Sequence, residues 1–248
     1  MTPRLRVSFV IPAYNEEALL PACLDAIKAE LARTPCTAEI IVVNNASTDG
    51  TVAVAAAVPG VIVVDQPVKG LVQARSAGFE ASTGVLVANI DADTLLPEGW
   101  LARVLTTFDT QPKLVCLSGP YDYHDVPLRI RMMTRAFYGL GYAAYLFNKR
   151  VLGVGSMVQG GNFVVLRDAL AGIGGISDRF TFYGEDTDIA QRLSKVGDVV
   201  FTYEMMAKSS GRRLRGDGVM VTGIRYGANY VWATFFRRPF TTAWNDYR

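Results

Sequence analysis

The chain has 248 residues, half of them hydrophobic, which is enough to bury the core of one large α/β domain or two small ones. Its 25 Lys and Arg residues nearly balance 23 Asp and Glu residues, so the charge does not favour nucleic acid as a partner. Residues 136–147 are uncharged, but Lys149 and Arg150 end this segment well short of the roughly 20 residues of a transmembrane helix. We recognise no signal peptide in the sequence, and Cys23, Cys36 and Cys116 do not have the spacing of a zinc or redox motif. We therefore expect a cytoplasmic protein.

The first half of the chain alternates between strand and helix patterns. Short apolar runs predict strands at 6–12, 39–44, 61–65 and 85–90. Apolar residues at helical spacing predict helices at 16–33 and 70–82, with another beginning near Gly50. This alternation is typical of a parallel sheet with helices on both faces, where ligands bind beyond the carboxyl ends of the strands. Each of these strand ends is followed by a polar loop, so we expect the loops to meet at one crevice.

The second half is less regular and richer in aromatic residues. We expect strands at 114–119, 159–166 and 199–203 and helices at 128–148, 185–196 and 216–236. No linker, internal repeat or low-complexity segment divides the chain. We therefore predict a single domain over residues 1–248.

Two aspartates one residue apart, Asp91 and Asp93, follow the fourth predicted strand. Because strand side chains alternate between faces, both carboxylates should project to the same spot. A divalent cation relieves their repulsion, and a diphosphate can share that cation. The alternative is an ordinary acidic turn between a strand and a helix, since D-x-D is common. The other motifs decide between the two interpretations.

Five motifs follow one another along the chain. They are PAYNEE at 12–17, NNASTDGT at 44–51, GGNFVVLRDAL at 160–170, GGIS at 174–177 and GEDTDIAQRL at 184–193. In this order and spacing they resemble the family 2 glycosyltransferases, inverting enzymes with the GT-A fold, from about residue 7 to residue 197. The resemblance implies a Rossmann-like, mostly parallel sheet, with a nucleotide-binding half at about 1–119 and an acceptor-binding half at about 120–248.

The first loop of such enzymes holds the nucleoside, which implies that Pro12, Tyr14 and Glu16 surround the base and ribose. The face of Tyr14 can stack on a base, a contact worth roughly 1–3 kcal/mol, or the ring can instead pack on the next helix. Asn45 stands where many members have an aspartate that reads the base edge. Asparagine can still donate to a base and accept from it, but the departure weakens the case for the UDP-sugar that we favour as donor.

By the same resemblance, Asp93 binds the metal directly, while Asp91 binds the ribose or reaches the metal through water; Ala92 between them lines the nucleotide-sugar site. Either Mn²⁺ or Mg²⁺ suits such hard oxygen ligands. Arg75 is expected to neutralise phosphate charge or to pair with a site carboxylate, and the alternative is a solvated surface arginine.

Arg212 and Arg213 lie in SGRRLRGDG, which resembles a basic motif that closes over the diphosphate in many members. A solvated basic loop is the alternative. The chain lacks the Q-x-x-R-W motif of processive synthases, so we expect the transfer of a single sugar.

Glu185 and Asp186 begin a predicted helix, where acidic residues are also favoured simply by the helix macrodipole. The resemblance implies that Asp186 is the general base and that Glu185 holds the acceptor. The chemistry needs one base, because the acceptor hydroxyl loses its proton while it attacks the anomeric carbon opposite the leaving diphosphate. Asp188 and Arg192 are expected to pair on the helix.

Residues 128–158 and 224–240 combine Arg and Lys with Tyr, Trp and Phe. This composition suits peripheral contact with the inner face of a membrane. It equally suits a helix packed on the core or a dimer contact. A lipid-linked acceptor is expected only if the membrane interpretation holds.

Together these features predict a metal-dependent inverting hexosyltransferase that moves one sugar from a nucleotide sugar to a hydroxyl acceptor. One alternative, a sugar nucleotidyltransferase, would have a glycine-rich basic loop where this chain has PAYNEE. Another is a scaffold without turnover that binds a sugar nucleotide or a membrane surface. The presence of Asp91, Asp93, Glu185 and Asp186 together argues against a decayed site.

Overall fold

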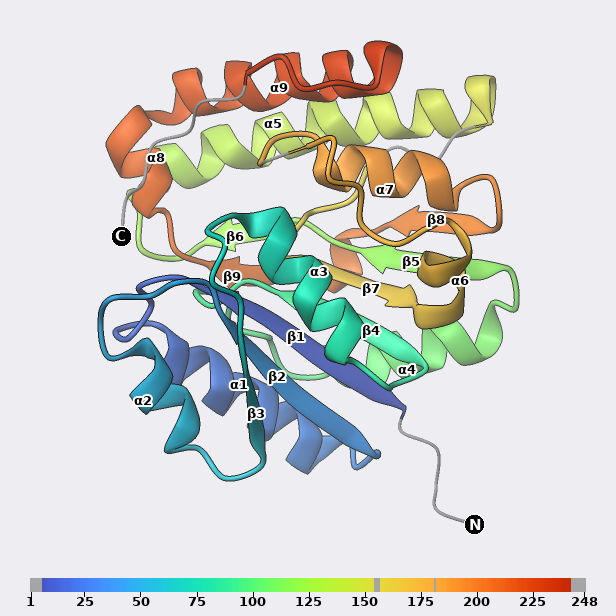
Figure 1. Cartoon of the computed structure of the whole chain (residues 1–248). Helices are drawn as coiled ribbons and strands as arrows, with labels where there is room; N and C mark the ends of the chain where they lie inside the picture. The colour runs from blue at the N-terminus through green and yellow to red at the C-terminus, as the bar shows by residue number, and fades with distance from the viewer. Residues whose placement is uncertain (1–5, 154–156, 181, 242–248) are drawn as a thin grey trace.

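A central sheet organises this computed structural model, which describes residues 6–153, 157–180 and 182–241. Its seven strands lie in the order β3-β2-β1-β4-β7-β5-β8 (Figure 1). Their bounds are β1 (Val7–Ala13), β2 (Ala38–Asn44), β3 (Val61–Asp65), β4 (Leu86–Ile90), β5 (Leu114–Ser118), β7 (Asn162–Leu166) and β8 (Asp198–Phe201). β7 is antiparallel to both of its neighbours, and the other adjacent pairs are parallel. The predicted mostly parallel sheet is therefore confirmed.

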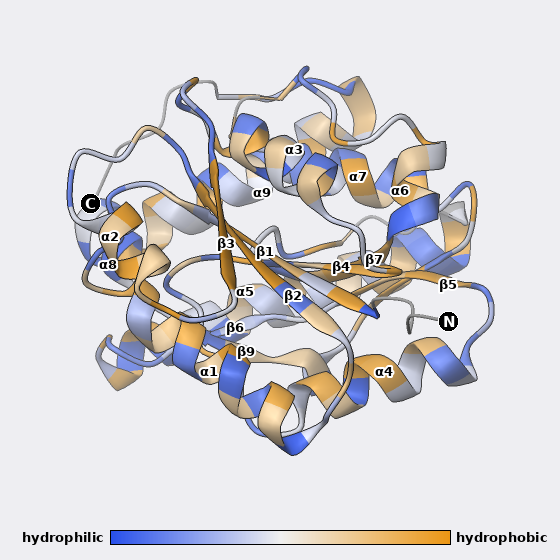
Figure 2. Ribbon diagram, turned by 60° about the horizontal axis from the view of Figure 1, so that its bottom comes forward, coloured by the Kyte–Doolittle hydropathy of each residue, from blue (hydrophilic) through white to orange (hydrophobic). Residues whose placement is uncertain are grey.

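Helices cover both faces of the sheet. On one face lie α1 (Leu20–Arg33), α2 (Thr51–Ala56) and α4 (Trp100–Thr110), and on the other α3 (Leu71–Ala81), α6 (Arg167–Gly172) and α7 (Glu185–Leu193). Alternating side chains of β1 enter both cores: Phe9 and Ile11 pack with α1, and Val10 packs with α3. Figure 2 shows the strands as a mainly hydrophobic layer between the helices. Burial on both faces explains why β1 and β4 are continuous apolar runs in the sequence.

The second half adds elements over the edge of the sheet where the parallel strands end. They are β6 (Tyr121–Tyr123), α5 (Leu128–Phe147) with a π-helical turn at Asn148–Leu152, a 3₁₀ turn at Tyr203–Met205, β9 (Ala207–Ser209), α8 (Arg212–Asp217) and α9 (Val219–Phe236). β6 and β9 form a separate parallel pair. Figure 1 shows α5 and α9 side by side above the sheet. Among the described residues, no helix combines the length and the apolar character needed to cross a membrane.

Two predicted helices have different bounds in the structure. The helix predicted from residue 16 begins at Leu20, because Pro21 occupies its first turn, a position that proline favours. The helix predicted at 216–236 is α9, which begins at Val219, and Gly218 at φ +81° separates it from the short helix α8. A left-handed backbone conformation of this kind favours glycine. Arg212 and Arg213 lie in α8, which argues against the alternative of a solvated basic loop.

Helices α4 and α6 and strands β6 and β9 lie outside the elements predicted from the sequence. The start of α4 depends on Glu30 of α1, which is fully buried. Its carboxylate accepts hydrogen bonds from Gly99 N (3.2 Å) and Leu101 N (2.9 Å) and pairs with Arg33 (3.2 Å). An acidic group at this position also favours the helix dipole. The cap of α4 therefore comes from a residue about 70 positions earlier in the chain, and no local pattern shows it.

Candidate active site

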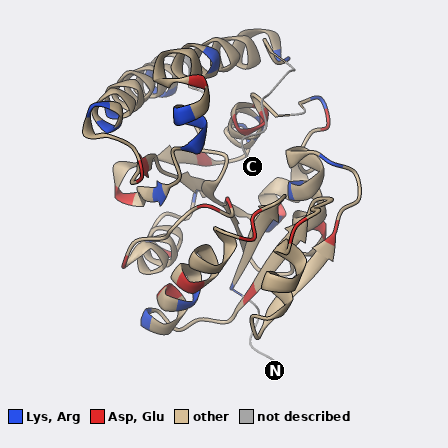
Figure 3. Ribbon diagram, turned by 90° about the vertical axis from the view of Figure 1, so that its left-hand side faces the viewer, with Lys and Arg blue, Asp and Glu red and all other residues tan. Residues whose placement is uncertain are grey.

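A cavity of about 600 Å³ opens where β1 and β4 end and where α7 and α8 begin. Ten of the residues singled out in the sequence line it: Pro12, Glu16, Arg75, Asp91, Ala92, Asp93, Glu185, Asp186, Arg212 and Arg213. Tyr14 and Asn45 line a small pocket beside it, which shares Pro12 with the cavity. Figure 3 views the molecule from the side of α8, where basic and acidic segments meet. Residues from distant parts of the chain are thus gathered at one site.

Arg75 lies at the centre of a buried ionic cluster. Its side chain is 3% exposed, with Nη1 2.5 Å from Glu185 Oε2 and Nη2 3.0 Å from Asp91 Oδ1. Arg75 is therefore not a solvated surface residue but joins the loop after β4 to the start of α7. Burial of charges is costly unless they are paired, so this arginine holds both carboxylates in fixed positions.

The two glycines of the GGNF motif leave room for this cluster. A Cβ atom on Gly161 would lie only 2.0 Å from Asp91 Cγ and 2.3 Å from Tyr121 Oη, and one on Gly160 would lie 3.0 Å from Arg75 Nη1. The carboxylate of Asp91 can therefore lie directly against the backbone, where Tyr121 Oη donates to its Oδ2 at 3.3 Å. In the backbone, Asp91 N donates to Gly161 O at 3.1 Å. Because Gly160 and Gly161 have no side chains, Arg75 and Asp91 can occupy the space next to them.

A second ionic cluster joins α8 to the first loop. Arg212 forms a two-pronged ion pair with Glu16, in which Nη1 lies 2.9 Å from Oε2. Its Nη2 also lies 3.2 Å from Asp93 Oδ2. On the other side, Ser209 Oγ donates to Asp93 Oδ1 at 3.3 Å. Arg212 therefore holds the cavity side of α8 on the two acidic residues that the sequence analysis placed at the nucleotide and the metal.

Asp91 and Asp93 both line the cavity, but not by the strand geometry from which their convergence was predicted. The strand ends at Ile90, and the aspartates lie in a turn in which Thr94 N donates to Asp91 O at 2.9 Å. Strand alternation does not apply there, and each carboxylate has a different arginine as its partner. Among the described residues, no group of three or more His, Cys, Asp or Glu side chains is arranged to hold a metal. A cation bound here would need oxygen ligands from a second molecule, such as a diphosphate.

The pair Glu185 and Asp186 begins α7, after Gly184 at φ +88°. Asp186 Oδ1 accepts from Thr187 N at 2.8 Å. Burial raises the pKa of Asp186 above its ordinary value, although this hydrogen bond and Arg75 oppose the shift. Burial also raises the pKa of Glu185, against the effect of Arg75. A carboxylate with a raised pKa is a better proton acceptor, which suits Asp186 to general-base chemistry.

Tyr14 and Asn45 are engaged with the loop before α3. The Asn45 amide donates to Val68 O (2.7 Å) and Gln66 O (3.2 Å), and its oxygen accepts from Gly70 N (2.7 Å). Lys69 Nζ lies 3.7 Å from the centroid of the Tyr14 ring, in a cation–π arrangement. Asn45 thus shapes the loop, while its contact with a base stays a prediction.

Arg213 points into different surroundings from its neighbour Arg212. Its guanidinium lies 4.5 Å from the Phe182 ring centroid, and Nη1 donates to Tyr226 Oη at 2.8 Å. Tyr226 belongs to α9, so Arg213 links α8 to the aromatic side of the cavity. Arg212 therefore pairs with the carboxylates of the cavity, whereas Arg213 contacts its aromatic side chains.

Tyr121 and Ser209 contact the aspartates but were not among the residues predicted from the sequence. Tyr121 follows a predicted strand, so the rule that polar groups gather at strand ends could have found it. Ser209 lies in the three-residue strand β9, whose position depends on pairing with β6. No local pattern identifies a strand this short.

A family model described as glycosyl transferase family 2 matches residues 8–174. The chain belongs to this family. The match covers the sheet from β1 to β7 and both aspartates after β4, and the general-base candidate lies downstream of it.

Three curated relatives match parts of the chain. It is 32% identical over 106 residues to glycosyltransferase AglE of Haloferax volcanii, covering 41% of this chain and 34% of the relative. It is 40% identical over 109 residues to an uncharacterized glycosyltransferase of Mycobacterium bovis, covering 44% and 46%. It is 38% identical over 105 residues to an undecaprenyl-phosphate 4-deoxy-4-formamido-L-arabinose transferase of Aeromonas hydrophila, covering 40% and 32%. The matched segments span less than half the length of each relative.

Solved structures extend the likeness of fold over nearly the whole chain. A mannosyltransferase of Pyrobaculum calidifontis in complex with GDP-Man and Mn²⁺ aligns with a TM-score of 0.68 and 22% identity, covering 95% of this chain and 65% of that one. Glucosyl-3-phosphoglycerate synthase of Mycobacterium tuberculosis, in complex with Mn²⁺ and UDP-glucose, aligns with a TM-score of 0.61 and 22% identity, covering 92% and 79%. The fold is thus of the GT-A glycosyltransferase type.

Proposed function

We propose that this protein transfers a single hexosyl group from a nucleotide sugar to a hydroxyl acceptor, with inversion at the anomeric carbon. The observation that carries the proposal is one cavity lined both by Asp91, Asp93 and Arg212 and by Asp186. The first group suits a diphosphate with its cation, and the last suits a proton acceptor. Residues 1–119 would supply most of the nucleotide site, and residues 120–248 the acceptor site.

On the donor side, Asp93 would bind Mn²⁺ or Mg²⁺ directly, and Asp91 would contact the ribose or reach the metal through water. The two aspartates are hard oxygen donors close to each other in the turn after β4, which is the ligand chemistry these ions prefer. When bound, the cation would stabilise the charge that develops on the leaving diphosphate. Arg212 would exchange its ion pair with Asp93 for one with the diphosphate, because both need the same guanidinium.

On the acceptor side, Asp186 would take the proton of the acceptor hydroxyl. The hydroxyl oxygen would form the new bond to the anomeric carbon as the bond from that carbon to the diphosphate oxygen breaks. The electron pair of the broken bond leaves with the nucleoside diphosphate. Attack opposite the leaving group inverts the anomeric configuration. Glu185, held by Arg75, would orient the acceptor.

The donor is proposed to be a UDP-sugar, and the location to be the cytoplasm, where thiols stay reduced. The three cysteines are unpaired in the structure, which suits such a compartment. Among the structural neighbours, one was solved with GDP-Man and another with UDP-glucose. A donor panel is therefore the natural test.

The experiment incubates the purified protein with UDP-, GDP- and dTDP-sugars and Mn²⁺, with and without chelator, and measures the nucleoside diphosphate released. Release from one donor, abolished by chelator, is expected. With an acceptor found, Asp186→Asn should lower the transfer rate by about 10²-fold or more, without loss of donor binding. Asp178→Asn is the matched control, because Asp178 is exposed and lies outside the cavity.

Three results would contradict the proposal. Release of pyrophosphate would indicate a nucleotidyltransferase. Donor binding without turnover across many acceptors would indicate a scaffold. Full activity of the Asp186→Asn variant would show that Asp186 is not the general base.

A further inference from the structure

The cavity extends beyond the ionic clusters, along the contact between α5 and α9. In this extension, which we call the apolar arm, the lining changes from charged to hydrophobic or small residues: Leu140, Gly141 and Ala144 of α5 and Gly227, Tyr230 and Val231 of α9. Asp186 and Glu185 line the same cavity at its polar end. The proposed site of sugar transfer is therefore continuous with an apolar space.

Close contacts join α9 to α5 and to the π-helical turn that follows α5, on either side of the apolar arm. At one, the Phe137 ring lies against Gly223, where a Cβ atom would come within 2.6 Å of the ring. At the other, Asn148 Nδ2 donates to Tyr230 Oη at 2.6 Å. A Cβ atom on Gly227, by contrast, would meet no atom within 4 Å. The arm therefore lies where the two helices lack filling side chains.

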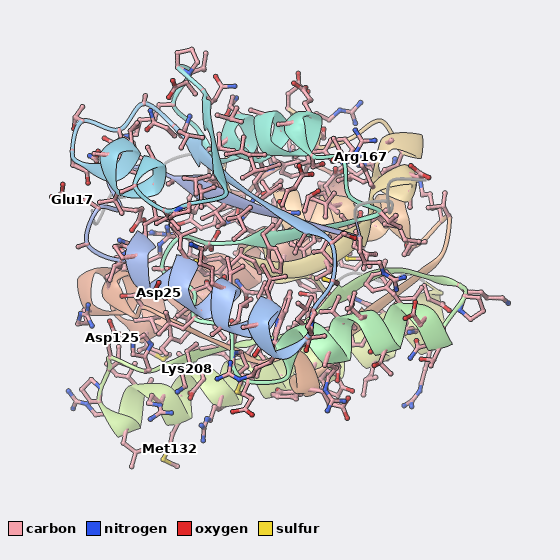
Figure 4. The ribbon with its side chains drawn as sticks, turned by 90° about the horizontal axis from the view of Figure 1, so that it is seen from below. Glu17, Asp25, Asp125, Met132, Arg167 and Lys208 are labelled. Carbon is pink, nitrogen blue, oxygen red and sulfur yellow. The ribbon has the colours of Figure 1, made fainter. Side chains whose placement is uncertain are left out.

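The outer surface of both helices is apolar. Exposed hydrophobic residues recur at helical spacing on one face of each: Leu128, Met132, Leu140 and Phe147 on α5, and Met220, Ile224, Val231 and Phe235 on α9. Met132 is seen in Figure 4 to project away from the body of the molecule. Leu140 and Val231 belong both to this exposed surface and to the cavity lining. The apolar arm thus reaches the exposed apolar surface.

The charge on this surface is entirely positive. Residues 128–152 and 219–240 contain eight Lys and Arg residues and none of the 23 acidic residues of the chain. Arg131, Arg135 and Arg225 pair with acidic residues outside these segments, whereas Arg129, Arg150, Arg237 and Arg238 are exposed. Apolar side chains bordered by cations suit an anionic lipid surface. A second copy of the chain would bring like charges together.

We propose that α5 and α9 bind the surface of an anionic membrane and that the acceptor is a lipid whose aliphatic chain lies in the apolar arm. Its hydroxyl then lies at Asp186, which takes the proton as the oxygen bonds to the anomeric carbon and the nucleoside diphosphate leaves. The role of the hydroxyl rests on the proposed function, whereas binding of the membrane and of the chain does not.

Membrane binding is tested by flotation with vesicles of phosphatidylcholine and phosphatidylglycerol, and with vesicles of phosphatidylcholine alone. Flotation is expected with the anionic vesicles. Met132→Asp, and separately Arg237→Ser with Arg238→Ser, should each lower the bound fraction on the order of tenfold. Val196→Asp is the matched control, because Val196 is equally exposed but lies outside α5 and α9.

Occupation of the arm is tested with a long-chain aliphatic alcohol that carries a diazirine, added to the same vesicles and photolysed. Labelling is expected at residues 140–144 and 227–231. Gly227→Leu should fill the arm and remove most of that labelling. Gly139→Leu should leave it unchanged, because Gly139 also has open space around a Cβ atom but does not line the cavity.

Three outcomes would overturn the inference. The first is that the protein does not float with anionic vesicles. The second is labelling that is confined to the exposed face and unchanged by Gly227→Leu. The third is a dimer that Met132→Asp dissociates, with no binding of vesicles by either the dimer or the monomer. The labelling needs neither donor nor metal. It can therefore succeed even if Asp186 proves not to be the base, and the two proposals fail independently.

Discussion

Replacing Arg75 by methionine should destabilise the protein far more than the loss of an ordinary ion pair. Arg75 and Glu185 are 3% and 2% exposed, and the variant leaves the Glu185 carboxylate buried without its partner at 2.5 Å. Breaking a buried pair from one side costs about 3–5 kcal/mol in the free energy of unfolding. For a chain of this size, about 2–4 °C per kcal/mol places the fall in Tm on the order of 10 °C.

The loss should depend on pH, and its sign follows from Glu185. Burial already raises the pKa of this carboxyl, and removal of Arg75 raises it further. Above the unfolded value of about 4.3, the native state keeps a proton that the unfolded chain releases. Stability of the variant should therefore fall as pH rises, by up to about 1.4 kcal/mol per pH unit.

The assay is urea unfolding at about pH 5.5 and about pH 8, monitored by tryptophan fluorescence. The Arg75→Met variant should have the lower free energy of unfolding at the higher pH, about pH 8. Arg103→Met is the control, because Arg103 and its partner Glu204 are 48% and 65% exposed, and such pairs contribute about 0–1 kcal/mol. Glu185→Leu in the Arg75→Met background should regain part of the stability. The reasoning would be refuted if Arg75→Met and Arg103→Met lowered the free energy of unfolding equally. A loss in Arg75→Met that does not change with pH would also refute it.

Three further predictions follow from the site and from the α4 cap. Gly161→Ala would place a methyl group 2.0 Å from Asp91 Cγ, so metal-dependent activity should fall by about 10–100-fold while circular dichroism stays native. Because burial raises the pKa of Asp186, kcat should rise with pH through that raised value and then level off; a flat acidic limb in the pH profile would contradict this. Glu30→Ala leaves the amide of Leu101 without its acceptor and should cost about 1–3 kcal/mol in urea unfolding, whereas Glu30→Gln, which keeps an acceptor, should cost less.

The local sequence was sufficient to predict the α/β architecture. β1, β2 and β4 are apolar runs bounded by polar loops, and their burial on two faces leaves a pattern that needs no knowledge of distant contacts. The i,i+4 pair of Asp188 and Arg192 was predicted from spacing alone and is present at 2.6 Å. The alternation of strands and helices also implied that the polar loops would meet. The loops after β1 and β4 do line one cavity, and Asn45 and Lys69, after β2 and β3, line the small pocket beside it.

The partners of those residues could not be predicted in the same way. Arg75 contacts Glu185 across 110 positions, and Arg212 contacts Glu16 across 196. Such pairs form because packing brings buried charges together, and their spacing along the chain carries no information about that. The strand-alternation argument for Asp91 and Asp93 fails for a related reason: a local rule was applied where the chain had already left the strand, although both side chains do line the same cavity.

The sequence by itself thus determined the sheet, its main helices and the residue types at the strand ends, since these depend on periodicity and on polarity over a few residues. Only the tertiary structure decided that each aspartate pairs with its own arginine, that Gly160 and Gly161 leave space for the Arg75 cluster, and that an apolar arm runs from Asp186 to the surface of α5 and α9. These features arise where elements far apart in the chain pack together, because close packing and the pairing of buried charge are properties of the folded molecule.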